Sequence, residues 1–275
     1  MALYIHTNMA TVRSTRHLAV VERNLDSTMD KLSSGRRVNE AADDAAGLAV
    51  AENLDANVRG SRQAMRNIET GLSMIHVAES GTETDQTLVK RMRELAVMSS
   101  SETLQNTERS YLQDEFNQLV AEVDDLANNT LFGGVHLIDG RNPTLDVQAG
   151  VNNTSNDRVT ISMGDISVDT IGLNTGLVSL STATQARLAI DQLDSTLNTL
   201  NRYRAQYGAS ESSLSQALGN MELYSENLQA SQSQIIDADF ATESANLSRH
   251  QIVKQAGLSI LAQGNSLSEG LLGLL

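Results

Sequence analysis

The sequence predicts a mainly α-helical protein, in which long antiparallel helices from the N- and C-terminal segments form a coiled-coil bundle with a small β-hairpin region in the middle. The chain of 275 residues has one proline, Pro143, no Trp and only 3% aromatic residues. Because proline breaks helix interiors, long helices are permitted on both sides of residue 143. Leu, Ile, Val, Met and Ala suffice to fill a seam between helices, whereas a thick core normally needs aromatic side chains.

Apolar residues in the N-terminal half repeat every three or four positions, which is the spacing of amphipathic helices. The first helix should end at Ser33-Ser34-Gly35. The last helix of this half should be capped by Thr107 or Ser110 and end at Asn128-Asn129. The apolar repeats are Leu18, Val21, Leu25, Met29 and Leu32; Met65, Ile68, Leu72 and Ile75; Leu88, Met92 and Leu95; and Leu112, Phe116, Leu119, Val123 and Leu126.

The segment 131–180 changes pattern, because glycines divide it into short pieces. Two of these pieces, TLDVQAG at 144–150 and RVTISMG at 158–164, alternate apolar and polar residues, which is the period of a β-strand. A small β-hairpin region is therefore expected at about 131–180, where the chain turns round. The helices on its two sides must then run antiparallel or be very extended.

The C-terminal half repeats the helical spacing. The residues at this spacing, apolar except for Ser225, are Leu193, Leu197, Leu200 and Tyr207; Leu214, Leu218, Met221, Ser225 and Leu228; and Ile252, Ala256, Ile260, Leu267 and Leu271. We expect residues 1–42 and 237–275 to form a terminal coiled-coil domain, and residues 43–236 to form a helical bundle that carries the hairpin. Isolated amphipathic helices are marginal in water, so the two ends should pack on each other and on neighbouring subunits. The alternative is an ordinary intramolecular bundle with frayed ends.

Composition and motifs argue against most other functions. The net charge of −14 does not suit nucleic-acid binding, no apolar run is long enough for membrane insertion, and the start of the chain lacks the pattern of a secretory signal. There is no Cys, no catalytic constellation and no motif for a cofactor, so we expect neither an enzyme nor a cofactor. A metal-dependent bundle of ferritin type would need Glu-x-x-His pairs on facing helices, but His76 precedes Glu79 in the reverse order.

Five segments are similar to bacterial flagellin and occur in the order of that family. They are IHTNMA at 5–10, SSGRRVNEAADDAAGLAVAENL at 33–54, RMRELAVMSS at 91–100, TLFGGVHLIDG at 130–140 and DADFATESANLSRHQIVKQAGLSILAQ at 237–263. Gly133 stands where the family usually has Asn, and Met98 where Gln is common. The short middle leaves no room for outer domains, so the resemblance implies a short flagellin with the inner domains only.

The resemblance implies a structural subunit that polymerises with itself into the bacterial flagellar filament for motility. It also implies type III export, secretion to the extracellular filament, and partners among the export chaperones and the cap and junction proteins. The residues assigned to subunit assembly are Leu18, Val21, Leu25, Leu32, Ile252, Ala256, Ile260, Leu267 and Leu271. A hook–filament junction protein, which has similar terminal segments, is the alternative.

The resemblance further implies a host partner, an innate-immune Toll-like receptor that binds many flagellins. The family motif falls on Arg91 and Leu95 in RMRELAV and on Glu115 in YLQDEF. Arg91 and Leu95 are four residues apart and share a helical face. The alternative interpretation places Leu95 in the helical seam and makes both charged side chains ordinary solvated groups.

Overall fold

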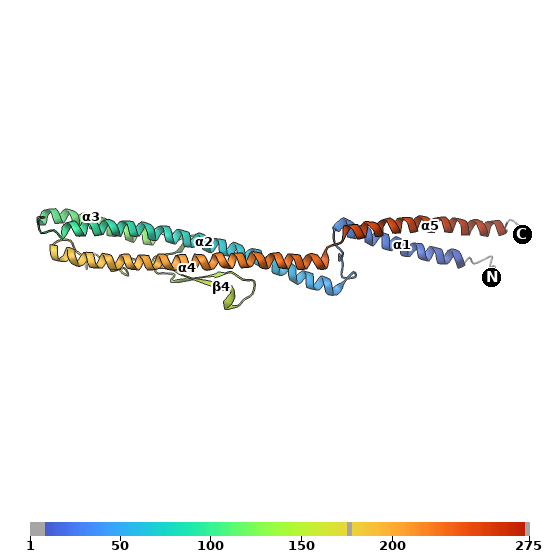
Figure 1. Cartoon of the computed structure of the whole chain (residues 1–275), viewed down its shortest axis with the longest axis horizontal. Helices are drawn as coiled ribbons and strands as arrows, with labels where there is room; N and C mark the ends of the chain where they lie inside the picture. Colours follow the sequence, from blue (N-terminus) through green and yellow to red (C-terminus); the bar gives the residue numbers. More distant parts are fainter. Residues whose placement is uncertain (1–8, 175–177, 273–275) are drawn as a thin grey trace. The chain divides into compact units, whose positions relative to one another are not determined.

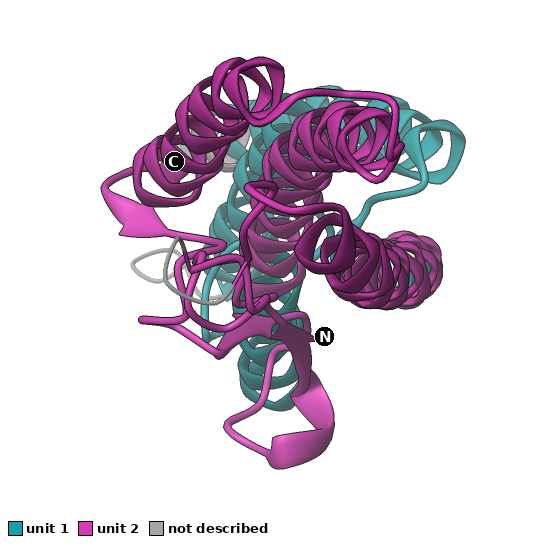
Figure 2. Cartoon of the chain, turned by 90° about the vertical axis from the view of Figure 1, so that its left-hand side faces the viewer, with its two compact units in different colours: residues 1–58, 226–275 teal, residues 59–225 magenta. Residues whose placement is uncertain are grey.

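The computed structural model describes residues 9–174 and 178–272, and the side chains of residue 10 and residues 267–272 are not described. The chain divides into two compact units (Figure 2). Unit 1 consists of Met1–Val58 with Glu226–Leu275, and unit 2 of Arg59–Ser225. The sequence predicts domain boundaries elsewhere, between residues 42 and 43 and between residues 236 and 237. These boundaries remain a prediction.

The predicted helices are confirmed. The described residues form α1 (Met9–Ser34), α2 (Ala45–Ser99), α3 (Asn106–Asn129), α4 (Ala183–Ile236) and α5 (Phe240–Leu272), with a short 3-10 turn at Ser155–Asp157 (Figure 1). None of the helices that the structure describes has a stretch both long and apolar enough to cross a membrane.

Local chemistry sets the ends of the helices. Gly35, with φ of +69°, follows α1 in a conformation that side chains disfavour. At the start of α2, the backbone N–H of Gly47 donates to Asp44 Oδ1 at 2.9 Å, which satisfies a free N-terminal donor. The predicted caps of α3 are wrong, because the helix starts at Asn106, where the Gln105 backbone N–H donates to the Glu108 carboxylate at 2.9 Å. The predicted end at Asn129 is confirmed.

The buried face of α2 in unit 2 follows two unbroken heptad series. Seven-residue spacing keeps one stripe of a helix against its neighbours, as in a coiled coil. The apolar set predicted from the sequence captured only part of this stripe, because small and polar residues occupy many of its positions. The buried series are Ser61, Ile68, Ile75, Thr82, Val89 and Ala96, and Ala64, Gly71, Ala78, Asp85, Met92 and Ser99.

The strands of the middle segment are also confirmed. β3 (Thr144–Gln148) pairs antiparallel with β4 (Arg158–Ser162), with Thr144 opposite Ser162 and Gln148 opposite Arg158. A second, shorter pair, β1 (Leu131–Phe132) and β2 (Val135–His136), turns through Gly133 and Gly134, both at positive φ. In β3 and β4, Val147 and Ile161 are buried in the same core as α2, α3 and α4.

One buried tyrosine fixes the chain after β4 to α4. Tyr207 is completely buried, and its hydroxyl accepts a hydrogen bond from the Gly164 backbone N–H at 2.9 Å. Gly164 has no room for a side chain, since a Cβ there would lie 2.8 Å from the Tyr203 ring. The hairpin segment is therefore held on the α4 side of unit 2 by a specific polar contact as well as by apolar packing.

Candidate assembly surface

Unit 1 contains two short connections that are hydrogen-bonded to each other. The Arg37 backbone N–H donates to Ile236 O at 2.5 Å, and the Arg37 guanidinium donates to Ile235 O at 2.6 Å. The Ala238 backbone N–H donates to Gly35 O at 3.0 Å. The end of α1 and the start of α5 are thereby fixed next to each other.

Asp239 organises the first turn of α5. Its carboxylate accepts hydrogen bonds from the backbone N–H groups of Ala241 and Thr242 and from the Thr242 hydroxyl. The Thr242 hydroxyl and these two N–H groups lower the pKa of Asp239 below its ordinary value. The carboxylate therefore stays ionised at the positive end of the helix dipole.

Helices α1 and α5 lie side by side and antiparallel (Figure 1). Leu18 faces Gly257, where an added Cβ would lie 3.4 Å from Leu18 Cδ1. Thr11 faces Gly264, where an added Cβ would lie 3.7 Å from Thr11 Cγ2. Lys254 pairs with Glu22 at 3.1 Å along the same contact. Gly257 and Gly264 therefore lie on the stripe of α5 that contacts α1.

The α1 stripe in this contact contains the predicted assembly residues Leu18, Val21, Leu25 and Leu32, all of them partly buried. The predicted seam residue Met29 is not part of it, since Met29 is 53% exposed while Thr28 is buried. The Thr28 hydroxyl donates to Asn24 O at 2.8 Å, which makes a buried threonine acceptable there.

A second apolar face of α5 is not covered by α1. Ile252 is 68% exposed and Ile260 is 59% exposed, and Ala256 between them is exposed as well. Four-residue spacing places these three side chains on one side of the helix. Most of the partly buried positions of α5 follow another stripe, Glu243, Leu247, His250, Lys254, Gly257, Leu261 and Gly264. The predicted residues Leu267 and Leu271 lie outside the residues whose side chains the structure describes.

Further large apolar side chains of unit 1 are exposed. They are Met9, Val12, Val20 and Met29 on α1 and Phe240, Val253 and Leu258 on α5. Monomeric proteins rarely leave so much apolar surface on so thin a structure, and such surface marks a site of protein–protein contact. The helix pair of unit 1 is therefore our candidate assembly surface.

In unit 2, the structure brings together two of the three predicted receptor residues. Arg91 on α2 donates to Glu115 Oε1 on α3 through Nε at 3.1 Å and Nη2 at 2.8 Å, and to Glu94 through Nη1 at 3.0 Å. The bonds to Glu115 and Glu94 raise the pKa of Arg91. Both the Arg91 and Glu115 side chains are close to half exposed, whereas Leu95 is completely buried in the core. A partner on this surface would therefore touch the ion pair and not the leucine.

Sequence comparison and structure comparison agree with each other. The family described as bacterial flagellin N-terminal helical region matches residues 5–143, and the bacterial flagellin C-terminal helical region matches residues 190–275. A flagellin of Halalkalibacterium halodurans is 35% identical over 99% of this chain and 100% of its own length. The flagellar filament 33 kDa core protein of Treponema phagedenis is 32% identical over the same shares.

Among solved structures, the crystal structure of Bacillus cereus flagellin matches 57% of this chain and 88% of its own, with a TM-score of 0.50 and 26% identity. A flagellar hook-associated protein from Vibrio parahaemolyticus matches 71% of this chain and all of its own, with a TM-score of 0.58. At 14% identity, this second likeness shows only that the fold is shared.

Proposed function

This chain belongs to the bacterial flagellin family and is a structural subunit of the flagellar filament, and we propose that its subunits join through the apolar face of α5 that α1 leaves uncovered. It polymerises with itself and is not an enzyme. Relatives named flagellin or filament core protein favour a filament subunit over a junction protein. The single observation that carries the proposal is the exposed face formed by Ile252, Ala256 and Ile260.

The physical argument for this face is its burial energy. Each large aliphatic side chain that moves from water into a packed interface contributes about 1.5–3 kcal/mol. Since α1 already covers a different stripe of α5, the uncovered face is free to contact another copy of the chain. A contact between unlike faces of identical subunits gives an open helical polymer when its rotation does not close into a ring.

The test of assembly is seeded polymerisation. Purified monomer mixed with short filament seeds should elongate them into filaments that electron microscopy can measure and that sediment at high speed. The critical concentration, the monomer concentration left at the plateau, reports the free energy of subunit addition. If the monomer stays entirely in the supernatant at every concentration while the seeds remain intact, the proposal fails.

We further propose export in unfolded form to the extracellular filament, with a chaperone bound to the terminal helices before assembly and a cap protein at the growing tip. Family membership supports this route. The exposed apolar faces of α1 and α5 support a chaperone, because they would promote premature association in the cell.

We also propose that the Arg91–Glu115 pair is the centre of a surface recognised by a Toll-like receptor. Arg91 provides directional donors and Glu115 an acceptor, and each remains close to half exposed while paired. An exposed ion pair contributes little to folding, so its replacement should leave the monomer folded. Leu95, which is buried, would act here only by holding α2 in place.

Arg91→Ala and Glu115→Ala should each weaken receptor binding by about 1–3 kcal/mol, the cost of losing a charged hot-spot side chain. A receptor reporter assay on monomeric protein measures this. Arg93→Ala is the matched control, because Arg93 lies two residues away on α2 and pairs with Asp194 on α4 instead. A silent wild type, or equal signalling by all three variants, would refute the assignment.

A further inference from the structure

We propose that His76, Glu79 and Glu211 form a binding site for a divalent transition-metal ion on the surface of unit 2. The imidazole nitrogen and the two carboxylates can each offer one ligand atom, and these atoms lie within 4.8 Å of one another. Metal–ligand bonds of about 2.0–2.2 Å need a slightly tighter cluster. The two glutamates and the histidine are exposed enough for their side chains to rotate inward by that amount.

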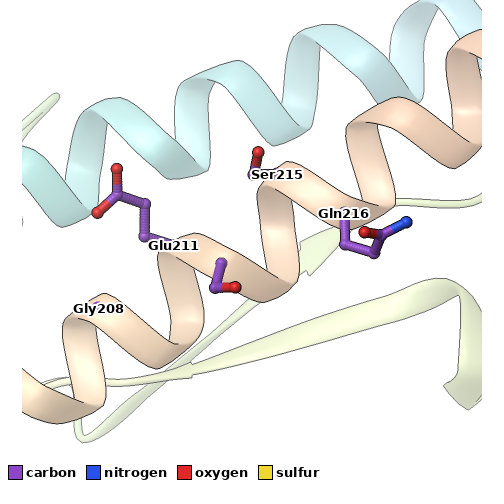
Figure 3. A pocket seen from close by; sticks show the side chains of 5 residues that line it. Gly208, Glu211, Ser215 and Gln216 are labelled. Carbon is purple, nitrogen blue, oxygen red and sulfur yellow. The ribbon is translucent and has the colours of Figure 1, made fainter.

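Two rigid helices hold the three side chains in place. His76 and Glu79 are three residues apart on α2 and share one face, while Glu211 reaches across from α4. Figure 3 shows the Glu211 carboxylate pointing from α4 toward the facing helix. Since α2 and α4 already pack together in the core of unit 2, an ion would be bound without a change of fold.

The imidazole is only loosely engaged by its neighbour. His76 Nε2 lies 3.8 Å from Glu211 Oε1, which is too long for a good hydrogen bond. An open hollow of about 400 Å³ adjoins the cluster and is lined by Gly208, Glu211, Ser212, Ser215 and Gln216. Gly208, one turn before Glu211, has nothing within 4 Å of where a Cβ would stand. Water ligands of the ion therefore have room on this side.

The donor set selects the class of ion. Ca²⁺ and Mg²⁺ prefer oxygen ligands only, whereas one imidazole with two carboxylates suits Zn²⁺, Ni²⁺ or Cu²⁺. Arg204 opposes binding in part, because its Nη2 lies 3.3 Å from Glu79 Oε1 and brings a positive charge. Its Nη1 also donates to Gln86 at 3.2 Å, so the guanidinium is anchored on the side away from Glu211. The second oxygen of Glu79 remains for the ion.

The experiment is titration of the full-length monomer with Zn²⁺ alone, followed by calorimetry and by thermal unfolding. We expect saturable binding of one ion per chain and a rise in the melting temperature, because an ion bound only to the folded state stabilises it. His76→Gln and Glu211→Gln should each weaken binding about tenfold or more.

The matched controls are His17→Gln on α1 and Glu83→Gln, which lies one turn beyond Glu79 on α2, and both should bind Zn²⁺ as the wild type does. The site is refuted if the wild type shows no saturable binding. It is equally refuted if His76→Gln and Glu211→Gln retain wild-type affinity, since the ion would then be held by other surface carboxylates. The assembly proposal is argued from α5 and not from this site, so the failure of one leaves the other untouched.

Discussion

Aspartate at both Ile252 and Ile260 is expected to abolish filament growth and leave the monomer folded. Both residues are more than half exposed in the subunit, so the substitutions remove little intramolecular packing. In the filament, each change loses about 1.5–3 kcal/mol of apolar burial. Each carboxylate taken out of water without a partner adds several kcal/mol more. Since every 1.4 kcal/mol changes an equilibrium about tenfold, the critical concentration should rise beyond any practical value.

Seeded polymerisation and sedimentation measure this effect, and circular dichroism verifies that the monomer is folded. Ile252→Val and Ile260→Leu, which keep the face apolar, are the controls and should polymerise at concentrations close to wild type. Ordinary filaments from the double aspartate variant would remove α5 from the assembly contact and direct attention to the exposed residues of α1.

The helices and strands of this chain could be predicted because their signals are local. Apolar spacing, the break at Gly35 and the alternation in TLDVQAG and RVTISMG depend on nearby residues, and the structure confirms each of them. The composition of the helical seams could not be predicted in this way. Thr28, Thr82 and Ser99 are buried although they are polar, because each hydroxyl donates to a backbone carbonyl. A search for apolar side chains passes over such positions, whereas seven-residue counting from Ile68 and Ile75 would have reached Thr82.

The assembly and receptor residues show a similar limit. Sequence spacing placed Ile252, Ala256 and Ile260 on one side of a helix, and the structure shows all three exposed, but the spacing did not show which face of α5 meets α1. The contacts of α1 show it: Leu18 lies against Gly257 and Thr11 against Gly264, which places this stripe of α5 toward α1. Likewise, the motif placed Arg91 and Leu95 on one helical face, yet the close packing of unit 2 buries the leucine and exposes the arginine.

Asp85 is a buried seam residue of α2 whose ionised side chain cannot donate a hydrogen bond to a backbone carbonyl, as the buried hydroxyl groups do. It is completely buried, and neither carboxylate oxygen has a hydrogen-bond partner among the described residues. Thr82, one turn earlier, donates to Ala78 O at 2.8 Å, but an ionised carboxylate has no proton to donate. Burial therefore raises the pKa of Asp85 from 3.8 to about 7.

Because the unfolded chain releases this proton at a much lower pH, the folded state binds one more proton between about pH 4 and pH 7. The contribution of Asp85 to stability is present in full below pH 4 and is lost as the pH rises to 7. At 1.36 kcal/mol per pH unit, the loss is on the order of 4 kcal/mol. Asp239, whose pKa is lowered, has the opposite sign and loses its contribution only as the pH falls through its folded-state value.

Asp85→Asn, which has the same shape and no charge, should therefore unfold with a free energy close to that of wild type at pH 4 and a clearly larger one at pH 8. Urea unfolding at pH 4, 6 and 8 measures the difference, with the near-ultraviolet signal of tyrosine as the probe, since Tyr207 is buried in the same unit and the chain has no Trp. The comparison with wild type at each pH cancels the groups that both proteins share. Asp114→Asn, an exposed carboxylate on α3, should show no such divergence. If the two unfolding free energies of Asp85→Asn and wild type stay parallel from pH 4 to pH 8, Asp85 is ionised throughout and its burial is compensated by water or by motion of α2.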